Sequence, residues 1–235
     1  MVAKKNPLSI EKKHLIVFDI DDTLTKSEYQ HQKAYVKTMN QMGICEINDQ
    51  WETYQHVTDS YILKEHYEAY FKKKFDFSLI PEFEKKMTKA MLELPETKAI
   101  VGAKEAVRFF LRDTDYAICF ATGSLLAPAL LKLEQAGIYC IPDLLETSNT
   151  IYTRENIVKS AIKKAKNYFQ VTTFENIISV GDGVWDVKTA MNLGIYFLGI
   201  RDKNLKEFQQ LRIKSHIQDW SDFDFERVKV ELGIN

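Results

Sequence analysis

The sequence predicts an α/β fold, in which helices flank a Rossmann-like parallel sheet and a small all-helical domain is inserted after the first strand. The apolar run His14–Phe18 is typical of a strand that is buried on both faces. From residue 96 to about residue 200, apolar runs alternate with helix-like stretches, which indicates parallel strands joined by helices. Residues 25–95, which lie between these two parts, contain no strong strand pattern.

The first predicted strand ends abruptly in acidic residues. Asp19, Asp21 and Asp22 follow its apolar residues within four positions. Because an isolated buried carboxylate is very costly, we expect these side chains to emerge beyond the end of the strand. The carboxyl ends of the strands are where ligands bind to an open parallel sheet. This segment therefore predicts a metal-assisted active site at that edge.

The segment after the first strand is predicted to be helical. It is rich in aromatic residues, Lys and Glu, which recur at helix-like spacing. Met42-Gly43 is expected to end its first helix, because glycine after a periodic stretch acts as a C-terminal cap. We therefore expect residues 25–95 to form a helical cap domain, and residues 1–24 and 96–235 to form the core domain.

The remaining elements follow in order from residue 96. The predicted helices cover residues 102–112, 125–135, 154–168 and 184–192, and the predicted strands cover residues 116–121, 144–147, 176–180 and 195–199. The strand at residues 144–147 has the weakest pattern of the four. Strands that alternate with helices in this way favour a parallel sheet covered on both faces.

Composition and charge exclude several classes of function. The 235 residues carry a formal net charge of -1, so no global field favours binding to nucleic acid or to acidic membranes. No apolar run approaches the roughly 20 residues that a membrane span needs, and no signal-peptide pattern is seen. The three cysteines form no metal-spaced cluster, and with no signal peptide they favour a reducing, cytoplasmic location. The five histidines form no close ligand pattern, which argues against zinc.

Three predicted strands end in polar residues, which should meet at one edge of a parallel sheet. These residues are Asp19, Asp21 and Thr23 after the first strand, Thr122-Gly123 after a second, and Asp182 with Asp186 after a third. Asp19, Asp21 and Asp182 would provide hard oxygen ligands of the kind that Mg²⁺ prefers. Each acid taken alone also fits a turn or a helix cap, but their combination favours a metal site.

A phosphate group would fit beside such a metal. Thr122 has a hydroxyl, and the backbone amides after it can face an anion at a helix start. Lys159, in the first turns of the following predicted helix, is expected to bring a positive charge, and Arg154 is the alternative cation. The sequence therefore predicts a pocket for a phosphate group and a divalent cation.

These residues resemble the motifs of the haloacid dehalogenase (HAD) superfamily, in particular its phosphatase branch. The first family motif, an apolar strand followed by Asp-x-Asp-x-Thr, matches residues 19–23. The second, a strand ending in Thr or Ser, matches Thr122, and the third, a lysine near a helix start, matches Lys159. The fourth, Gly-Asp-x-x-x-Asp, matches residues 181–186. The inserted helical segment occupies the position of the family's cap, so the resemblance implies a HAD-like core with a helical cap.

The resemblance also implies roles for these residues. Asp19 would be the nucleophile that forms an aspartyl-phosphate, and Asp21 would be the general acid and base, which requires surroundings that favour its protonated form. Mg²⁺ would be held by the Asp19 side chain, the Asp21 backbone carbonyl and Asp182. The phosphate oxygens would be bound by Thr122, Gly123 and Lys159. Asp186 would bind a metal-bound water or orient Lys159.

The leading hypothesis is a magnesium-dependent phosphatase that hydrolyses a small phosphorylated metabolite. A phosphoryl-transfer mutase is a close alternative, and it would require the cap to present a second phosphate-binding group. Dehalogenase chemistry is less favoured, because it would leave the metal and the Asp21 acid/base without a role. A binding protein for a phosphate ligand, without catalysis, is an alternative from a different class.

Overall fold

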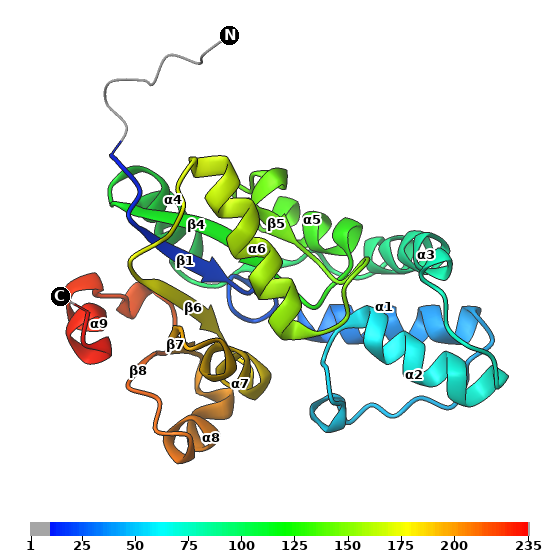
Figure 1. Cartoon of the computed structure of the whole chain (residues 1–235). Coiled ribbons are helices and arrows are strands. Elements are labelled where there is room, and N and C mark those ends of the chain that lie inside the picture. The colour runs from blue at the N-terminus through cyan, green and yellow to red at the C-terminus, as the bar shows by residue number, and fades with distance from the viewer. Residues whose placement is uncertain (1–9, 235) are drawn as a thin grey trace, which may run out of the picture.

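The computed structural model describes residues 10–234 and has a six-stranded parallel sheet at its centre, in the order β5-β4-β1-β6-β7-β8 (Figure 1). The strands are β1 His14–Phe18, β4 Tyr116–Ala121, β5 Leu145–Glu146, β6 Ile177–Gly181, β7 Tyr196–Ile200 and β8 Ser215–Ile217. All neighbouring pairs in this sheet are parallel. The predicted α/β fold class is confirmed.

Helices cover both faces of the sheet. They are α4 Ala103–Arg112, α5 Leu126–Gln135, α6 Arg154–Phe169, α7 Val184–Leu193, α8 Leu205–Gln210 and α9 Phe225–Leu232. Figure 1 shows α6 in front of β1 and β4, with α4 behind them. A parallel sheet needs this two-sided cover, because both of its faces are apolar.

The central strand β1 shows how the two faces are filled. Leu15 and Val17 belong to the core beneath α6, whereas Ile16 and Phe18 belong to the core beneath α4 and α9. All four side chains are almost fully buried. Each contributes about 1.5–3 kcal/mol by leaving water, so an acid within this run would be strongly unfavourable.

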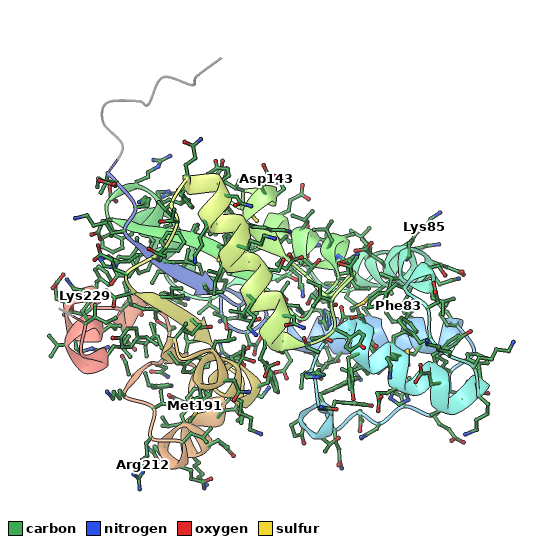
Figure 2. The ribbon with its side chains drawn as sticks, in the orientation of Figure 1. Phe83, Lys85, Asp143, Met191, Arg212 and Lys229 are labelled. Atoms are coloured by element: carbon green, nitrogen blue, oxygen red, sulfur yellow. The ribbon has the colours of Figure 1, made fainter. Side chains whose placement is uncertain are left out.

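Three helices form a separate lobe beyond the carboxyl end of β1 (Figure 1). They are α1 Glu28–Gln41, α2 Asp59–Phe71 and α3 Ile80–Leu92, and they enclose their own apolar cluster around Tyr35 and Phe83. Figure 2 shows Phe83 directed into the lobe and Lys85, on the same helix, directed away from it. The two chain segments that join lobe and core, β2 Thr25–Lys26 and β3 Lys98–Ala99, pair antiparallel.

The predicted helices and strands between residues 96 and 200 are all present, with ends shifted by at most one residue. Helix α1 ends at Gln41, and Gly43 adopts a φ of +81°, in keeping with its predicted terminating role. The three helices of the lobe lie within residues 25–95, and the exact boundaries of the two domains stay a prediction. The ends of the predicted core domain at residues 1–9 and 235 lie outside the described residues.

Several elements were not predicted. Strand β8 and helices α8 and α9 follow residue 200, and β2 and β3 have two residues each. Elements this short have too few residues to show a periodic pattern, and neighbouring structure determines them. Within residues 10–234, no helix combines the length and the apolar character needed to cross a membrane.

Candidate active site

The carboxyl ends of β1, β4 and β6 bring the predicted site residues together. Asp19, Thr122 and Asp182 each follow the last residue of one of these strands. Because β1 pairs with both β4 and β6 in parallel, the three residues reach the same edge of the sheet. Together with Asp21 and Gly123, they line one cavity of about 660 Å³, a volume that includes space open to solvent. This size suits a small-molecule ligand.

Three buried carboxylates form an acidic cluster at this cavity, and two of them, Asp19 and Asp182, line it. Asp19, Asp182 and Asp186 each place an oxygen atom within 4.8 Å of the oxygens of the other two. Burial and mutual repulsion raise the pKa of Asp19 and of Asp182 well above the usual value for a carboxyl group. A divalent cation would relieve this repulsion, and hard oxygen donors are the ligands that Mg²⁺ takes. The residues present therefore fit a magnesium ion.

The positive charge beside these acids comes from Arg154, the first residue of α6. Its guanidinium lies 3.3 Å from Asp19 Oδ1 and 3.1 Å from Asp186 Oδ1. Its Cζ lies over the Trp185 ring, 5.9 Å from the ring centroid. Arg154 is buried and lines the cavity. The loop backbone also passes close by, because a Cβ on Gly123 would lie 3.3 Å from the guanidinium and 2.6 Å from the carbonyl oxygen of Val57. Only glycine leaves room at that position.

The predicted cation Lys159 does not reach the cavity. Its side chain is exposed, and it is not among the residues that line the cavity. Residues in an α-helix turn by 100° per position, so Lys159, five residues after Arg154, points about 140° away from it. The alternative cation, Arg154, therefore takes the place that the sequence analysis gave to Lys159. Asp186 orients Arg154, where it was expected to orient Lys159.

The surroundings of Asp21 also differ from the prediction. Its carboxylate accepts hydrogen bonds from Lys132 Nζ at 2.6 and 2.7 Å and from Ser124 Oγ at 2.7 Å. Burial alone would raise the Asp21 pKa, but the charges of Lys132 and His31 and the hydrogen bonds from Lys132 and Ser27 outweigh it. The net effect lowers the pKa of Asp21. These surroundings favour the ionised form, whereas the protonated form is what the family resemblance implies.

Lys132 was not identified from the sequence. It lies on α5 with 0 % of its side chain exposed, within the apolar stretch Leu126–Leu133. Its position has the spacing of the buried residues Ala129 and Leu125, three and seven residues earlier. A lysine on the buried stripe of a helix requires a buried partner, because a lone charge there is very costly. That periodicity was the signal that would have revealed it.

The same polar network extends into the helical lobe. His31 on α1 lies between Lys132 and Asp59, with its Nδ1 at 3.2 Å from Lys132 Nζ and its Nε2 at 2.8 Å from Asp59 Oδ1. Asp59, at the start of α2, accepts the backbone N–H of Leu125 at 2.9 Å. Lys132, which pairs with Asp21, is therefore linked directly to α1 and, through His31, to α2.

The start of α5 is less open to an anion than the sequence analysis expected. The backbone N–H groups of Leu125, Leu126 and Ala127 donate to Asp59, Asn149 and Glu84 respectively. Within residues 10–234, the N–H of Gly123 has no such partner, and the buried hydroxyl of Thr122 accepts from the N–H of Ser124 and keeps its own proton to donate. Phosphate binding in this loop therefore depends on Thr122 and Gly123.

Adding Mg²⁺ to the metal-free protein is expected to stabilise it, because the ion offsets the repulsion among the three buried carboxylates. At 100 times its dissociation constant, the ion should raise the free energy of unfolding by about 2.7 kcal/mol. The gain in melting temperature should be larger at pH 8 than at pH 6, since protons compete with the metal for carboxylates whose pKa values are raised. Differential scanning fluorimetry with Mg²⁺ or EDTA measures this gain. An equal gain in Asp182→Asn would contradict the assigned site.

Comparison with known proteins agrees with this geometry. The family model for haloacid dehalogenase-like hydrolases matches residues 13–194. A HAD hydrolase of family IA, variant 3, from Entamoeba histolytica has a TM-score of 0.70 at 14% identity, covering 94% of this chain and 99% of its own. A β-phosphoglucomutase from Clostridium difficile has a TM-score of 0.64 at 15% identity, covering 94% and 97%. No curated protein matches the chain.

A further similar structure is a mutant of CbbY from Rhodobacter sphaeroides, in complex with xylulose-(1,5)-bisphosphate. It has a TM-score of 0.60 at 14% identity, covering 88% of this chain and 95% of its own. At these identities the solved structures establish a shared fold. The family model covers more than half of the chain, and the motif acids at residues 19, 21, 182 and 186 lie within the matched range. The chain belongs to the haloacid dehalogenase-like hydrolases.

Proposed function

We propose that this protein is a magnesium-dependent phosphatase that hydrolyses a small phosphorylated metabolite through an aspartyl-phosphate on Asp19. The observation that carries the proposal is the shared cavity, in which a buried carboxylate faces an acidic metal site, a fixed arginine and a free loop amide. Asp19 is held by Arg154 and by the hydroxyl of Thr23, at 3.3 Å each. These contacts fix the orientation of the carboxylate.

The reaction would proceed in two displacements. In the first, an oxygen of Asp19 bonds to phosphorus as the bond from phosphorus to the leaving oxygen breaks. In the second, water attacks the phosphorus and frees both phosphate and the Asp19 carboxylate. Thr122, the Gly123 amide and Arg154 would hold the non-transferring oxygens, so that positioning and charge stabilisation lower the barrier. Mg²⁺ held by Asp19, Asp182 and the Asp21 carbonyl would reduce the repulsion between the nucleophile and the phosphate dianion.

Asp21 would transfer protons at the leaving oxygen and at the attacking water. As an ionised carboxylate paired with Lys132, it is suited to the second displacement, in which it accepts a proton from water. In the first displacement the leaving oxygen needs a proton, and the buried ammonium group of Lys132 would supply it through the Asp21 carboxylate, which lies between Lys132 and the cavity. We propose that the Asp21–Lys132 pair serves both steps.

The cavity favours a hydrolase over a mutase. A mutase must hold a second phosphate group at the cap side of the cavity. The lobe residues that line the cavity include Glu28, His31 and Asp59 but no lysine or arginine. His31 is already paired with Asp59. Within the part of the chain that the structure describes, the lobe offers no unpaired cation to a second phosphate at this cavity.

The proposal predicts phosphate release from a generic aryl phosphate. Release should be at least 100-fold faster with Mg²⁺ than with EDTA, because charge neutralisation at the phosphate is worth several kcal/mol. A colorimetric assay of inorganic phosphate measures it. If neither the aryl phosphate nor a broad panel of phosphorylated metabolites released phosphate, while phosphate itself still bound, the non-catalytic binding protein would be the better description.

A further inference from the structure

The side of the cavity that would face the leaving group is formed by the helical lobe. Its wall consists of the aromatic rings of Tyr35 and Trp51 and the apolar side chains of Val57 and Ile62. The hydroxyl of Tyr35 donates its proton to the backbone oxygen of Asp59 at 2.8 Å, so that proton is not available to a ligand. These four residues therefore present mainly apolar surface, much of it aromatic.

Two polar residues of the same wall offer hydrogen-bond acceptors to a ligand. Glu28 and Gln32, one turn apart on α1, both line the cavity, and the Gln32 amide N–H donates to Glu28 Oε1 at 3.0 Å. The amide oxygen of Gln32 has no partner among the hydrogen bonds of residues 10–234. A ligand that reaches this wall is met by a carboxylate and an amide oxygen. Both groups prefer a donor such as a hydroxyl or an ammonium.

The charge around the cavity is strongly unbalanced. Among the described residues that line it, six are acidic (Asp19, Asp21, Asp22, Glu28, Asp59 and Asp182), whereas Arg154 is the single arginine or lysine. Bound Mg²⁺ would add two positive charges, and a phosphate dianion would cancel them. A second anionic group on the substrate would then be repelled by the remaining carboxylates. Solvent screens this repulsion poorly inside the cavity.

Three cations outside the lining, Lys132, Lys203 and Arg201, offset part of this negative charge, but each is already paired with a lining carboxylate. Lys203 pairs with Glu28, and Arg201 lies 4.0 Å from Asp22. An anionic ligand would have to take these cations from carboxylates that already hold them.

On the basis of the proposed hydrolase function, we infer that this site selects phosphomonoesters whose leaving alcohol is cationic or neutral, and rejects those with a second anionic group. The aromatic rings and the Glu28 carboxylate would bind an ammonium group by cation–π and ionic contacts. The Gln32 amide oxygen would accept a hydrogen bond from a hydroxyl or an ammonium. The arrangement thus ranks substrates in the order cationic, neutral, anionic.

The inference is tested with three phosphomonoesters of similar size that differ in charge. We expect kcat/KM at low ionic strength to fall from O-phosphoethanolamine to glycerol 1-phosphate to 3-phosphoglycerate, with at least a tenfold difference between the first and the last. The difference should shrink as salt is added, because screening weakens it. An anionic substrate used as well as the cationic one, or better, would overturn the inference while leaving the phosphatase proposal intact.

A pair of matched variants tests the wall itself. Glu28→Gln removes a carboxylate from the cavity and releases Lys203, so it should reduce the preference for O-phosphoethanolamine over 3-phosphoglycerate by about tenfold. Glu93→Gln also removes the acid of a lobe ion pair, that with Lys37, but away from the cavity. It should leave the ranking unchanged. An unchanged ranking in Glu28→Gln would overturn the role of this wall.

Binding to Asp19→Asn separates this inference from the proposed reaction. Isothermal titration of that variant with the same three compounds, in the presence of Mg²⁺, measures selectivity without turnover. If the wild type hydrolysed neither these compounds nor the broader panel but the binding order held, the selectivity would stand and the phosphatase proposal would fall. If binding favoured 3-phosphoglycerate, the inference on charge would be wrong.

Discussion

Asp19→Asn is expected to reduce phosphate release by at least about 10³-fold, the largest effect on activity that we predict for one substitution. The amide nitrogen and oxygen keep the shape of the carboxylate but cannot form the acyl-phosphate bond to phosphorus. The substitution also removes one of three mutually repelling buried carboxylates. The metal-free variant should therefore fold with a melting temperature equal to or above that of the wild type at pH 8. The phosphate assay and differential scanning fluorimetry measure the two effects.

The control for this substitution is Asp143→Asn. Asp143, labelled in Figure 2, is exposed just before β5 and is not among the residues that line the cavity. It should keep full activity. Brief reaction with ³²P-labelled substrate, followed by an acid quench, should leave label on the wild type and none on Asp19→Asn. Activity within tenfold of the wild type in Asp19→Asn would end the assignment of the nucleophile.

The parts of the site that the sequence predicted share one physical origin. Asp19, Thr122 and Asp182 each stand directly after an apolar run, and a buried parallel strand cannot continue through a polar residue without loss of stability. The position of each strand end was therefore visible from the sequence. Parallel pairing of β4, β1 and β6 then places these ends side by side. Local composition and one rule of sheet topology were enough.

The parts that were missed depend on the direction of side chains from helices. Arg154 and Lys159 are on the same helix, and only the rotation of α6 against the sheet decides which of them meets Asp19. Lys132 pairs with Asp21, 111 positions earlier in the chain. The local pattern predicts that Lys132 is buried. It shows neither that Lys132 pairs with Asp21 nor that this pairing lowers the Asp21 pKa. Tertiary packing also decides which groups bind the backbone N–H groups at the start of α5. There, carboxylates from the lobe accept hydrogen bonds from these N–H groups.

Lys132→Met is expected to lower the free energy of unfolding by about 2–3 kcal/mol, because it leaves the largely buried Asp21 carboxylate without its cation. This loss is smaller than the roughly 3–5 kcal/mol typical of breaking a fully buried ion pair, since 23% of the Asp21 side chain is exposed. Urea denaturation at pH 7.5 measures the loss. Lys85→Met on α3, an exposed lysine that Figure 2 shows pointing away from the lobe, should change stability by less than about 0.5 kcal/mol.

The double variant Asp21→Asn/Lys132→Met distinguishes a lost ion pair from poor packing of methionine. Removing the second charge as well should restore about half or more of the lost stability, because the remaining amide needs no cation. The pH dependence of the stability of Lys132→Met is an independent test of the ion pair. In Lys132→Met, burial without the cation raises the pKa of Asp21, so that variant should regain stability relative to the wild type as the pH falls from 7.5 towards 5. If the loss in the free energy of unfolding stays constant with pH and is not reduced in the double variant, Lys132 acts through packing. The proposal that the Asp21–Lys132 pair serves both displacements would then be wrong.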